Sequence, residues 1–133
     1  MSDAPMFATV EFYEAVADAL NNDPVWLDMA KPITYTMVFV YEEPVNKVFY
    51  LSFDEGRITE TLELANPTER SADFVITGKP DSWKGVILKT INPTSAMATG
   101  KLKVNGKQTV LLRHMKKFSY MIDKMTRIEA VFP

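Results

Sequence analysis

The sequence of 133 residues contains no cysteine and only one histidine. Without cysteine the chain has no disulfide, thiolate metal site, iron–sulfur cluster or cysteine nucleophile. His114 is the single candidate nitrogen ligand, and no acidic cluster has the spacing of a calcium-binding loop. The glycines match neither a phosphate-binding loop nor a dinucleotide fingerprint. We therefore expect no metal and no other cofactor.

Long apolar runs and targeting signals are also missing. No stretch of about 18 apolar residues exists, so we expect no membrane-spanning helix. Residues 1–5 show no basic stretch followed by an apolar core, and residues 130–133 are not a peroxisomal address. These absences predict a cytoplasmic protein. The length is typical of one domain, which we expect to span residues 1–133.

Residues suited to catalysis are scarce. Ser82, Ser95 and Ser119 lie in no nucleophile elbow, and His114 has no acidic residue close by in sequence. We therefore expect no enzyme and no catalytic residue. A small enzyme that pairs His114 with a serine or tyrosine in space stays open as a less favoured alternative, because such pairs are set by geometry rather than by sequence order.

Charge is distributed unevenly along the chain. Residues 101–133 hold eight of the 15 Lys/Arg residues and two of the 17 Asp/Glu residues, so they carry +6 within a formal net charge of −2. One interpretation is a solvated helix surface. The other is attraction to an anion, such as a lipid headgroup or a carboxylate. The acidic pI of about 5.4 argues against a nucleic-acid partner, and we expect none.

Hydropathy patterns predict an α+β protein. Helical spacing or capping signals favour helices over 5–20 and 24–30, a third of about ten residues from Pro80, and a short one after Pro93. Alternating or β-branched stretches predict strands over 33–41, 46–53, 57–64, 73–77 and 101–104, the last of them edge-like. The short connections between the first three strands predict an antiparallel meander.

The last predicted helix, over residues 108–125, has the clearest pattern. Leu111, Met115, Phe118, Ile122 and Met125 form an apolar stripe, and a cationic stripe that includes Lys117 and Lys124 lies opposite. The chain also has eight Met and eight Phe residues, which is high for its length. Because methionine packs into irregular spaces, this excess is typical either of ordinary core packing or of a cavity for a flexible apolar ligand.

Three stretches in the second half of the chain follow one another in a characteristic order. They are residues 72–78 (ADFVITG), Asp81-Ser82-Trp83 at a helix start, and residues 92–106 (NPTSAMATGKLKVNG) before the last predicted helix. On these stretches, the second half of the chain resembles the sterol carrier protein type-2 family. The run GKLKVNG is fairly specific in this order and context. The earlier strands agree with the family's order of elements but carry little motif identity.

This resemblance implies a five-stranded, mostly antiparallel sheet that helices cover on one face, with an apolar tunnel between the layers. It implies non-enzymatic binding or transfer of a fatty acid, fatty acyl-CoA, sterol or phospholipid, and it adds no catalytic residue. The alternative is an accessory module for protein interaction or oligomerisation that holds no lipid.

Ligand contacts are expected from inward sheet residues and from apolar helix residues: Phe49, Leu51, Phe74, Ile76, Trp83, Ile87, Met97, Leu111, Met115, Phe118 and Ile122. Each of these could equally be plain core. Lys116, Lys117 and Lys124 on the cationic side of the last helix are expected to approach anionic headgroups, with a transient contact to an anionic membrane surface.

Overall fold

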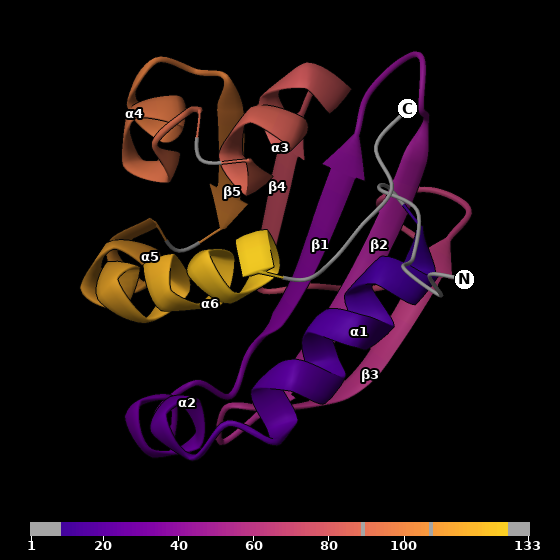
Figure 1. The fold of residues 1–133 in the computed structure, drawn as a ribbon. Coiled ribbons are helices and arrows are strands. Elements are labelled where there is room, and N and C mark those ends of the chain that lie inside the picture. The colour runs from indigo at the N-terminus through magenta and orange to yellow at the C-terminus, as the bar shows by residue number, and fades with distance from the viewer. Residues whose placement is uncertain (1–8, 89, 107, 128–133) are drawn as a thin grey trace, which may run out of the picture.

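The computed structural model describes residues 9–88, 90–106 and 108–127, and it has the expected α+β architecture (Figure 1). Five strands form one sheet: β1 (Thr36–Tyr41), β2 (Lys47–Asp54), β3 (Arg57–Leu64), β4 (Phe74–Gly78) and β5 (Leu102–Gly106). The helices are α1 (Val10–Asn21), α2 (Pro24–Met29), α3 (Pro80–Ile87), α4 (Pro93–Ala98), α5 (Gln108–Arg113) and α6 (Met115–Arg127). Within the described residues, no helix has the length and apolar character needed to cross a membrane.

The strand order is β3-β2-β1-β4-β5. The first three strands form the predicted antiparallel meander, and β5 lies antiparallel to β4 at the edge of the sheet. β4 pairs with β1 in parallel, with Phe39 opposite Ile76. Three of the four pairings are therefore antiparallel, which confirms a mostly antiparallel sheet.

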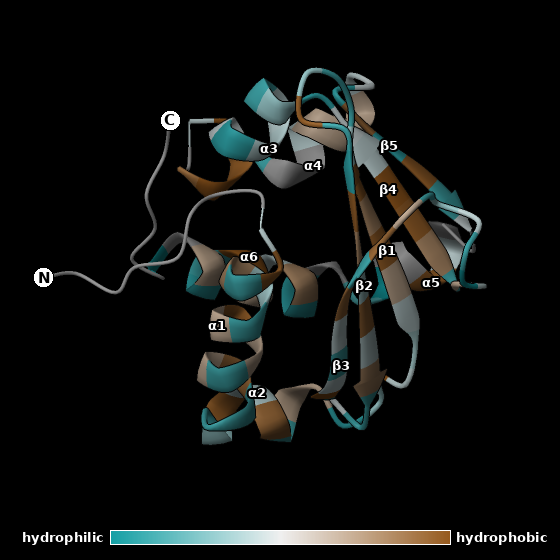
Figure 2. Cartoon of the chain, turned by 90° about the vertical axis from the view of Figure 1, so that its right-hand side faces the viewer, coloured by the Kyte–Doolittle hydropathy of each residue, from teal (hydrophilic) through white to brown (hydrophobic). Residues whose placement is uncertain are grey.

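The two faces of the sheet bury different sets of side chains. On the inner face, Met37, Phe39, Phe49 and Phe74 join one core cluster with residues of the helices. Figure 2 shows α1, α2, α3 and α6 on the same side of the sheet. The outer face carries a smaller cluster around Val38, to which no helix residue belongs among the described residues.

The outer face is partly covered by the connection between β3 and β4. This connection passes β2 and β1 because β3 and β4 are not neighbours in the sheet. Arg70 lies over the Tyr50 ring, 4.9 Å from its centroid, and pairs with Glu60 at 3.3 Å. Ala72 packs against the outer cluster. The four helices named above therefore cover the inner face, where the larger core cluster lies.

The first strand is shorter than predicted. Its β-branched and aromatic pattern suggested a start at residue 33, but the strand begins at Thr36. Residues 33 and 35 bond instead to the end of the β2–β3 hairpin, since the Ile33 carbonyl accepts from the Gly56 amide at 2.8 Å and the Tyr35 carbonyl from the Phe53 amide at 2.8 Å. Gly56 has a φ of +84°, the left-handed conformation expected of it.

The prediction of one helix over residues 108–125 is wrong. The chain forms α5 and α6 instead, separated at His114. The Phe118 amide still donates to the His114 carbonyl at 3.0 Å, as in a continuous helix. The interruption therefore leaves the phase of the apolar stripe unchanged, which is why hydrophobic periodicity did not reveal it. At the other end of the chain, α1 begins after its N-cap Thr9, and residues 5–8 of the predicted first helix lie outside the described residues.

Candidate functional site

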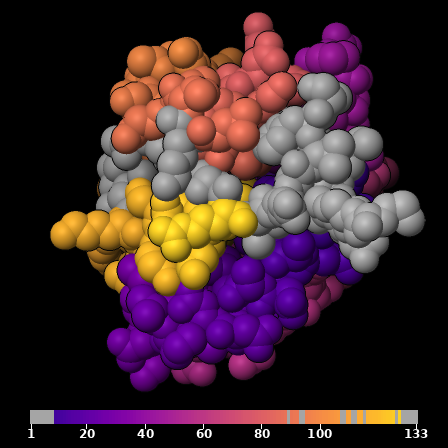
Figure 3. All heavy atoms as spheres, in the orientation of Figure 1, coloured from indigo at the N-terminus to yellow at the C-terminus, as the bar shows by residue number. Residues whose placement is uncertain are grey.

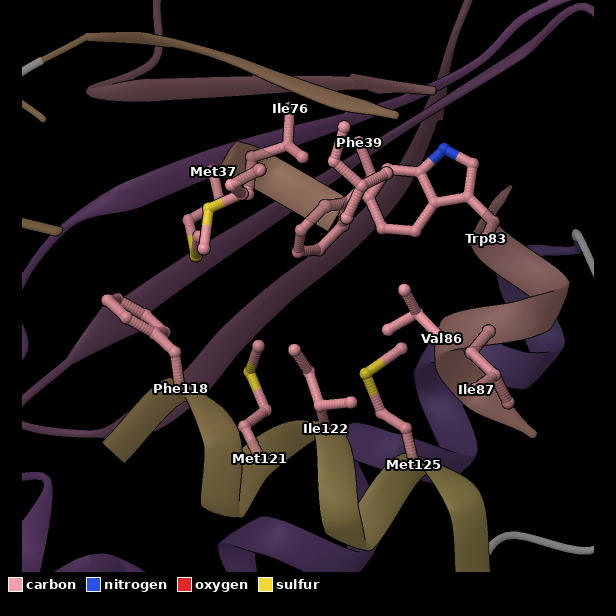
Figure 4. A pocket seen from close by; sticks show the side chains of 12 residues that line it. Met37, Phe39, Ile76, Trp83, Val86, Ile87, Phe118, Met121, Ile122 and Met125 are labelled. Carbon is pink, nitrogen blue, oxygen red and sulfur yellow. The ribbon is translucent and has the colours of Figure 1, made fainter. Parts of the chain in front are cut away.

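An apolar pocket lies between the inner face of the sheet and the helices α3, α4 and α6 (Figure 4). All of its lining side chains are aliphatic, thioether or aromatic: Met37, Phe39, Ile76, Trp83, Val86, Ile87, Met97, Leu102, Phe118, Met121, Ile122 and Met125. Figure 4 shows Met37 and Phe118 at one end of the pocket, and Trp83, Val86 and Ile87 at the other. The pocket therefore runs along α6 and offers only apolar contacts.

The enclosed volume is small compared with that of pockets that hold a ligand. The cavity measures about 40 Å³, whereas pockets that hold drug-sized ligands measure about 300–1,000 Å³. Four of the lining residues are methionines, whose unbranched side chains adapt to different shapes. A lipid-sized molecule would fit only if these side chains and the helices over the sheet moved apart.

Trp83 forms one end wall of the pocket and is held firmly. Its Nε1 donates to the Val40 carbonyl at 2.9 Å. Its ring stacks on Tyr41, with 5.0 Å between centroids, and meets Phe39 edge-on. Pro80 in the first turn of α3 suits a helix start, so α3 begins directly after β4 and places Trp83 against the sheet. This end wall is a fixed part of the pocket.

The long wall of the pocket that faces the sheet is α6. It is attached to the rest of the protein by a polar clasp, which we define as Asp23, Trp26, Tyr120 and Lys124. Asp23 Oδ2 accepts from the Tyr120 hydroxyl at 2.5 Å and lies 3.2 Å from Lys124 Nζ. The Tyr120 ring stacks on Trp26, with 6.2 Å between centroids. The hydrogen bond from Tyr120 is the main cause that lowers the pKa of Asp23 from 3.8. The clasp holds α6 closed over the pocket.

The predicted ligand-contact residues fall into three groups. Six of them line the pocket: Ile76, Trp83, Ile87, Met97, Phe118 and Ile122. Phe49, Leu51 and Phe74 are buried in the same core cluster but do not line this pocket. The side chains of Leu111 and Met115 lie outside the part of the structure that is described. Contact of any of them with a ligand stays a prediction.

Sequence reasoning missed six lining residues: Met37, Phe39, Val86, Leu102, Met121 and Met125. Met37 and Phe39 alternate with Val38 and Val40 in the sequence, so alternation groups them on one face of the strand but does not say which face is inward. Phe49 was preferred instead, but Phe49 packs against Tyr13 of α1, with 5.0 Å between centroids. Because the strand order sets β2 and β3 beneath α1, the pocket falls over β1, β4 and β5.

The three predicted headgroup lysines differ in their surroundings. Lys116 is exposed and Lys117 is half-buried. Lys124 is 27% exposed because it belongs to the clasp and pairs with Asp23. In the space-filling view of Figure 3, α6 in yellow lies at the surface between α1 and α2 on one side and α3 and α4 on the other. Lys116 and Lys117 are therefore better placed than Lys124 to meet an anionic surface.

His114 is the one buried polar residue among those described, and it is 8% exposed. Its ring lies 6.2 Å from that of Tyr35, between centroids. Burial, followed by the charges of Lys117 and Arg113, lowers the pKa of His114 from 6.5. Within the described part of the chain, Nδ1 has no hydrogen-bond partner and no group of residues could hold a metal ion. His114 thus has no catalytic partner at Nδ1 in this part of the chain.

Solved structures share this fold. A crystal structure of sterol carrier protein 2 matches with a TM-score of 0.80 and 19% identity, over 90% of this chain and 97% of its own. A solution structure from Thermus thermophilus, suggested to be a sterol carrier protein, matches with a TM-score of 0.82 and 19% identity, over 98% and 94%. A UbiJ-SCP2 ubiquinone synthesis protein has a TM-score of 0.62 and 14% identity, over 88% and 89%.

A sequence comparison assigns the family. No curated protein sequence matches the chain significantly. The sequence profile of the SCP-2 sterol transfer family, however, matches residues 16–119. This span includes the whole sheet, α3 and the first turn of α6, and therefore most of the pocket wall. The chain belongs to the SCP-2 sterol transfer family.

Proposed function

We propose that this protein binds and carries a long-chain lipid in the apolar pocket between the sheet and α6, without enzymatic turnover. The observation that carries the proposal is a lining of twelve apolar side chains with no polar residue among them. Membership of the SCP-2 sterol transfer family supports lipid binding or transfer. Action in the cytoplasm stays a prediction from the sequence.

Hydrophobic burial supplies enough free energy for such binding. At about 0.8 kcal/mol for each buried CH₂ group, a sixteen-carbon chain gains roughly 12 kcal/mol before costs. Immobilising the ligand and opening the protein subtract from this value. Where these costs stay below the gross gain, an apolar pocket without charged or catalytic groups is sufficient to bind a lipid.

The closed pocket implies that binding requires movement, and α6 is the wall best suited to move. It contributes four lining residues, more than any other element: Phe118, Met121, Ile122 and Met125. Its polar attachment through the clasp is concentrated at Asp23. By contrast, Trp83 bonds directly to the sheet at Val40. We expect α6 to move away from the sheet while α3 keeps its place.

The experiment that tests this proposal uses a tryptophan as a local reporter. Dibrominated stearic acid quenches tryptophan fluorescence at near contact. The Trp26→Phe variant retains only Trp83, which lines the pocket, and the Trp83→Phe variant retains only Trp26. We expect saturable quenching that is strong for Trp83 and weaker for Trp26. No saturable quenching of either variant, or of the unaltered protein, would contradict lipid binding.

An accessory role is the second candidate, and a specific likeness favours it. The fold is shared with the UbiJ-SCP2 ubiquinone synthesis protein, although at only 14% identity. In that case the chain would act through a partner protein or through self-association rather than through a bound lipid. Concentration-dependent association in analytical ultracentrifugation, together with no lipid uptake, would favour the accessory role over the carrier.

A further inference from the structure

His114 has an unusual environment for a polar side chain. It is 8% exposed, and its Nδ1 is buried without a hydrogen-bond partner among the described residues. Buried polar atoms are almost always paired, because leaving one unpaired costs free energy. No other buried side-chain nitrogen or oxygen in the described part of the chain lacks a partner. Nδ1 therefore lacks, within the described part of the chain, the partner that a buried nitrogen normally has.

His114 lies beside one end of the pocket. The Phe118 amide donates to the His114 carbonyl, so His114 lies one helical turn, about 5.4 Å, before a lining residue. Tyr35, whose ring neighbours that of His114, lies two residues before Met37 on the same face of its segment. Met37 and Phe118 form the end of the pocket opposite Trp83 (Figure 4). His114 and Tyr35 are not among the residues that line the pocket, but they lie next to its lining at that end.

The charges around His114 favour an anion. Lys117, one turn further along, is half-buried, and Arg113 is the adjacent residue on α5. The charges of both act on the imidazole, as the lowered pKa of His114 reflects after burial itself. Tyr35, on the β1 side, and Phe74, which meets Tyr35 edge-on at 5.6 Å, are uncharged aromatic neighbours. His114 thus combines a ring nitrogen that has no partner among the described residues with two cationic side chains whose charges act on it.

We infer that His114 anchors the carboxylate of a long-chain fatty acid whose hydrocarbon tail fills the apolar pocket toward Trp83. This inference rests on the proposed lipid-carrier function and specifies its ligand class. The imidazole N–H donates to a carboxylate oxygen, and Lys117 and Arg113 add favourable charge. A neutral ester of the same chain length gains the same apolar contacts but lacks the charge that these groups recognise.

The anchor is tested by comparing palmitate with methyl palmitate. We expect the protein to bind palmitate more tightly than the ester by about tenfold, the size of one charge-assisted hydrogen bond. In the His114→Phe variant, which keeps a flat ring beside Tyr35, this preference should fall to near unity while the affinity for methyl palmitate is retained. Isothermal titration calorimetry measures both ligands on both proteins.

A second measurement does not depend on the variant. His114 is the only histidine in the chain, so its imidazole nitrogens give a single assignable set of ¹⁵N NMR signals in the unaltered protein. Palmitate should shift these signals strongly, and methyl palmitate should shift them much less. Equal affinities together with equal shifts would overturn the anchor but leave lipid binding intact. If neither ligand binds, the proposed lipid-carrier function itself fails.

Discussion

At the scale of single residues, Asp23 links the helices that surround the pocket. Its Oδ1 caps α2 by accepting from the Val25 amide at 3.0 Å, while its Oδ2 accepts from Tyr120 of α6. The side chain is only 10% exposed, so its ion pair with Lys124 is less screened by water than a surface pair. One carboxylate therefore sets the start of α2 and holds α6 in place.

Two substitutions separate these roles of Asp23. Asparagine is also a good N-cap, so Asp23→Asn should keep the cap and lose the ion pair, and we expect the free energy of unfolding to fall by about 1 kcal/mol. Asp23→Ala removes the cap as well and should cost about 2–3 kcal/mol. Urea unfolding measures both values. Equal losses for the two variants would show that the ion pair alone matters and that the cap contributes nothing.

The lowered pKa of Asp23 also predicts how stability depends on pH. A carboxyl group whose pKa is lower in the folded state stabilises the fold above its unfolded pKa, here near 3.8. That contribution is lost as the pH falls from about 3.8 through the lower, folded pKa. The stability of the unaltered protein should therefore decline more steeply with acidification than that of Asp23→Asn. Parallel pH profiles of the two proteins would argue against the clasp.

At the scale of helices and strands, the sequence predicted much of the fold. Alternating or β-branched stretches identified all five strands, and the short connections between the first three predicted the antiparallel meander that includes the β2–β3 hairpin. The break at His114 was missed because it does not change the phase of the apolar stripe. Six of the eleven expected contact residues line the pocket. Phe49, Leu51 and Phe74 lie in the core beside the pocket rather than in its wall, because alternation groups the residues on one face of a strand but does not say which helix covers them.

We propose that a ligand enters the pocket when α6 moves away from the sheet. Tyr120→Phe removes the hydroxyl that donates to Asp23 but keeps the ring that stacks on Trp26. We expect this variant to take up a fluorescent fatty acid several-fold faster in stopped-flow measurements, because α6 detaches more readily. Its free energy of unfolding should fall by about 1 kcal/mol.

A control variant distinguishes detachment of α6 from general loosening. Lys31→Gln breaks an exposed ion pair with Asp28 that includes no residue of α6 or of the clasp, and such pairs contribute little to stability. Its uptake rate should equal that of the unaltered protein. If Tyr120→Phe takes up the probe no faster than Lys31→Gln, the entry route does not involve the clasp.

At the scale of the whole molecule, the uneven charge distribution suits a carrier that meets membranes. The basic C-terminal quarter contains α5 and α6, and α6 covers the pocket, while the acidic remainder carries α1 and the other pocket walls. An anionic bilayer would therefore orient the molecule with its movable helix toward the lipid. We propose that the ligand is exchanged at the membrane surface in this orientation.

Vesicle binding tests the orientation. Lys116→Gln/Lys117→Gln should weaken association with vesicles that contain 30% phosphatidylserine by about tenfold or more, since each basic residue near the surface contributes about 1 kcal/mol. The Lys31→Gln variant removes a charge just after α2 and should leave vesicle binding unchanged. Lys124→Gln should mainly reduce stability, because Lys124 pairs with Asp23. Unchanged binding of the double variant would exclude the electrostatic contact.

The central claim is that the space between the sheet and α6 opens to enclose an acyl chain, although only about 40 Å³ is free in the closed state. Isotope-filtered NOE spectroscopy with ¹³C-palmitate tests this most directly. If palmitate lies between the sheet and α6, its methylenes will show contacts to the methyl groups of Met121, Ile122 and Met125, and none to Val38 on the outer face. Contacts confined to the outer face, or no intermolecular contacts at saturating palmitate, would contradict it.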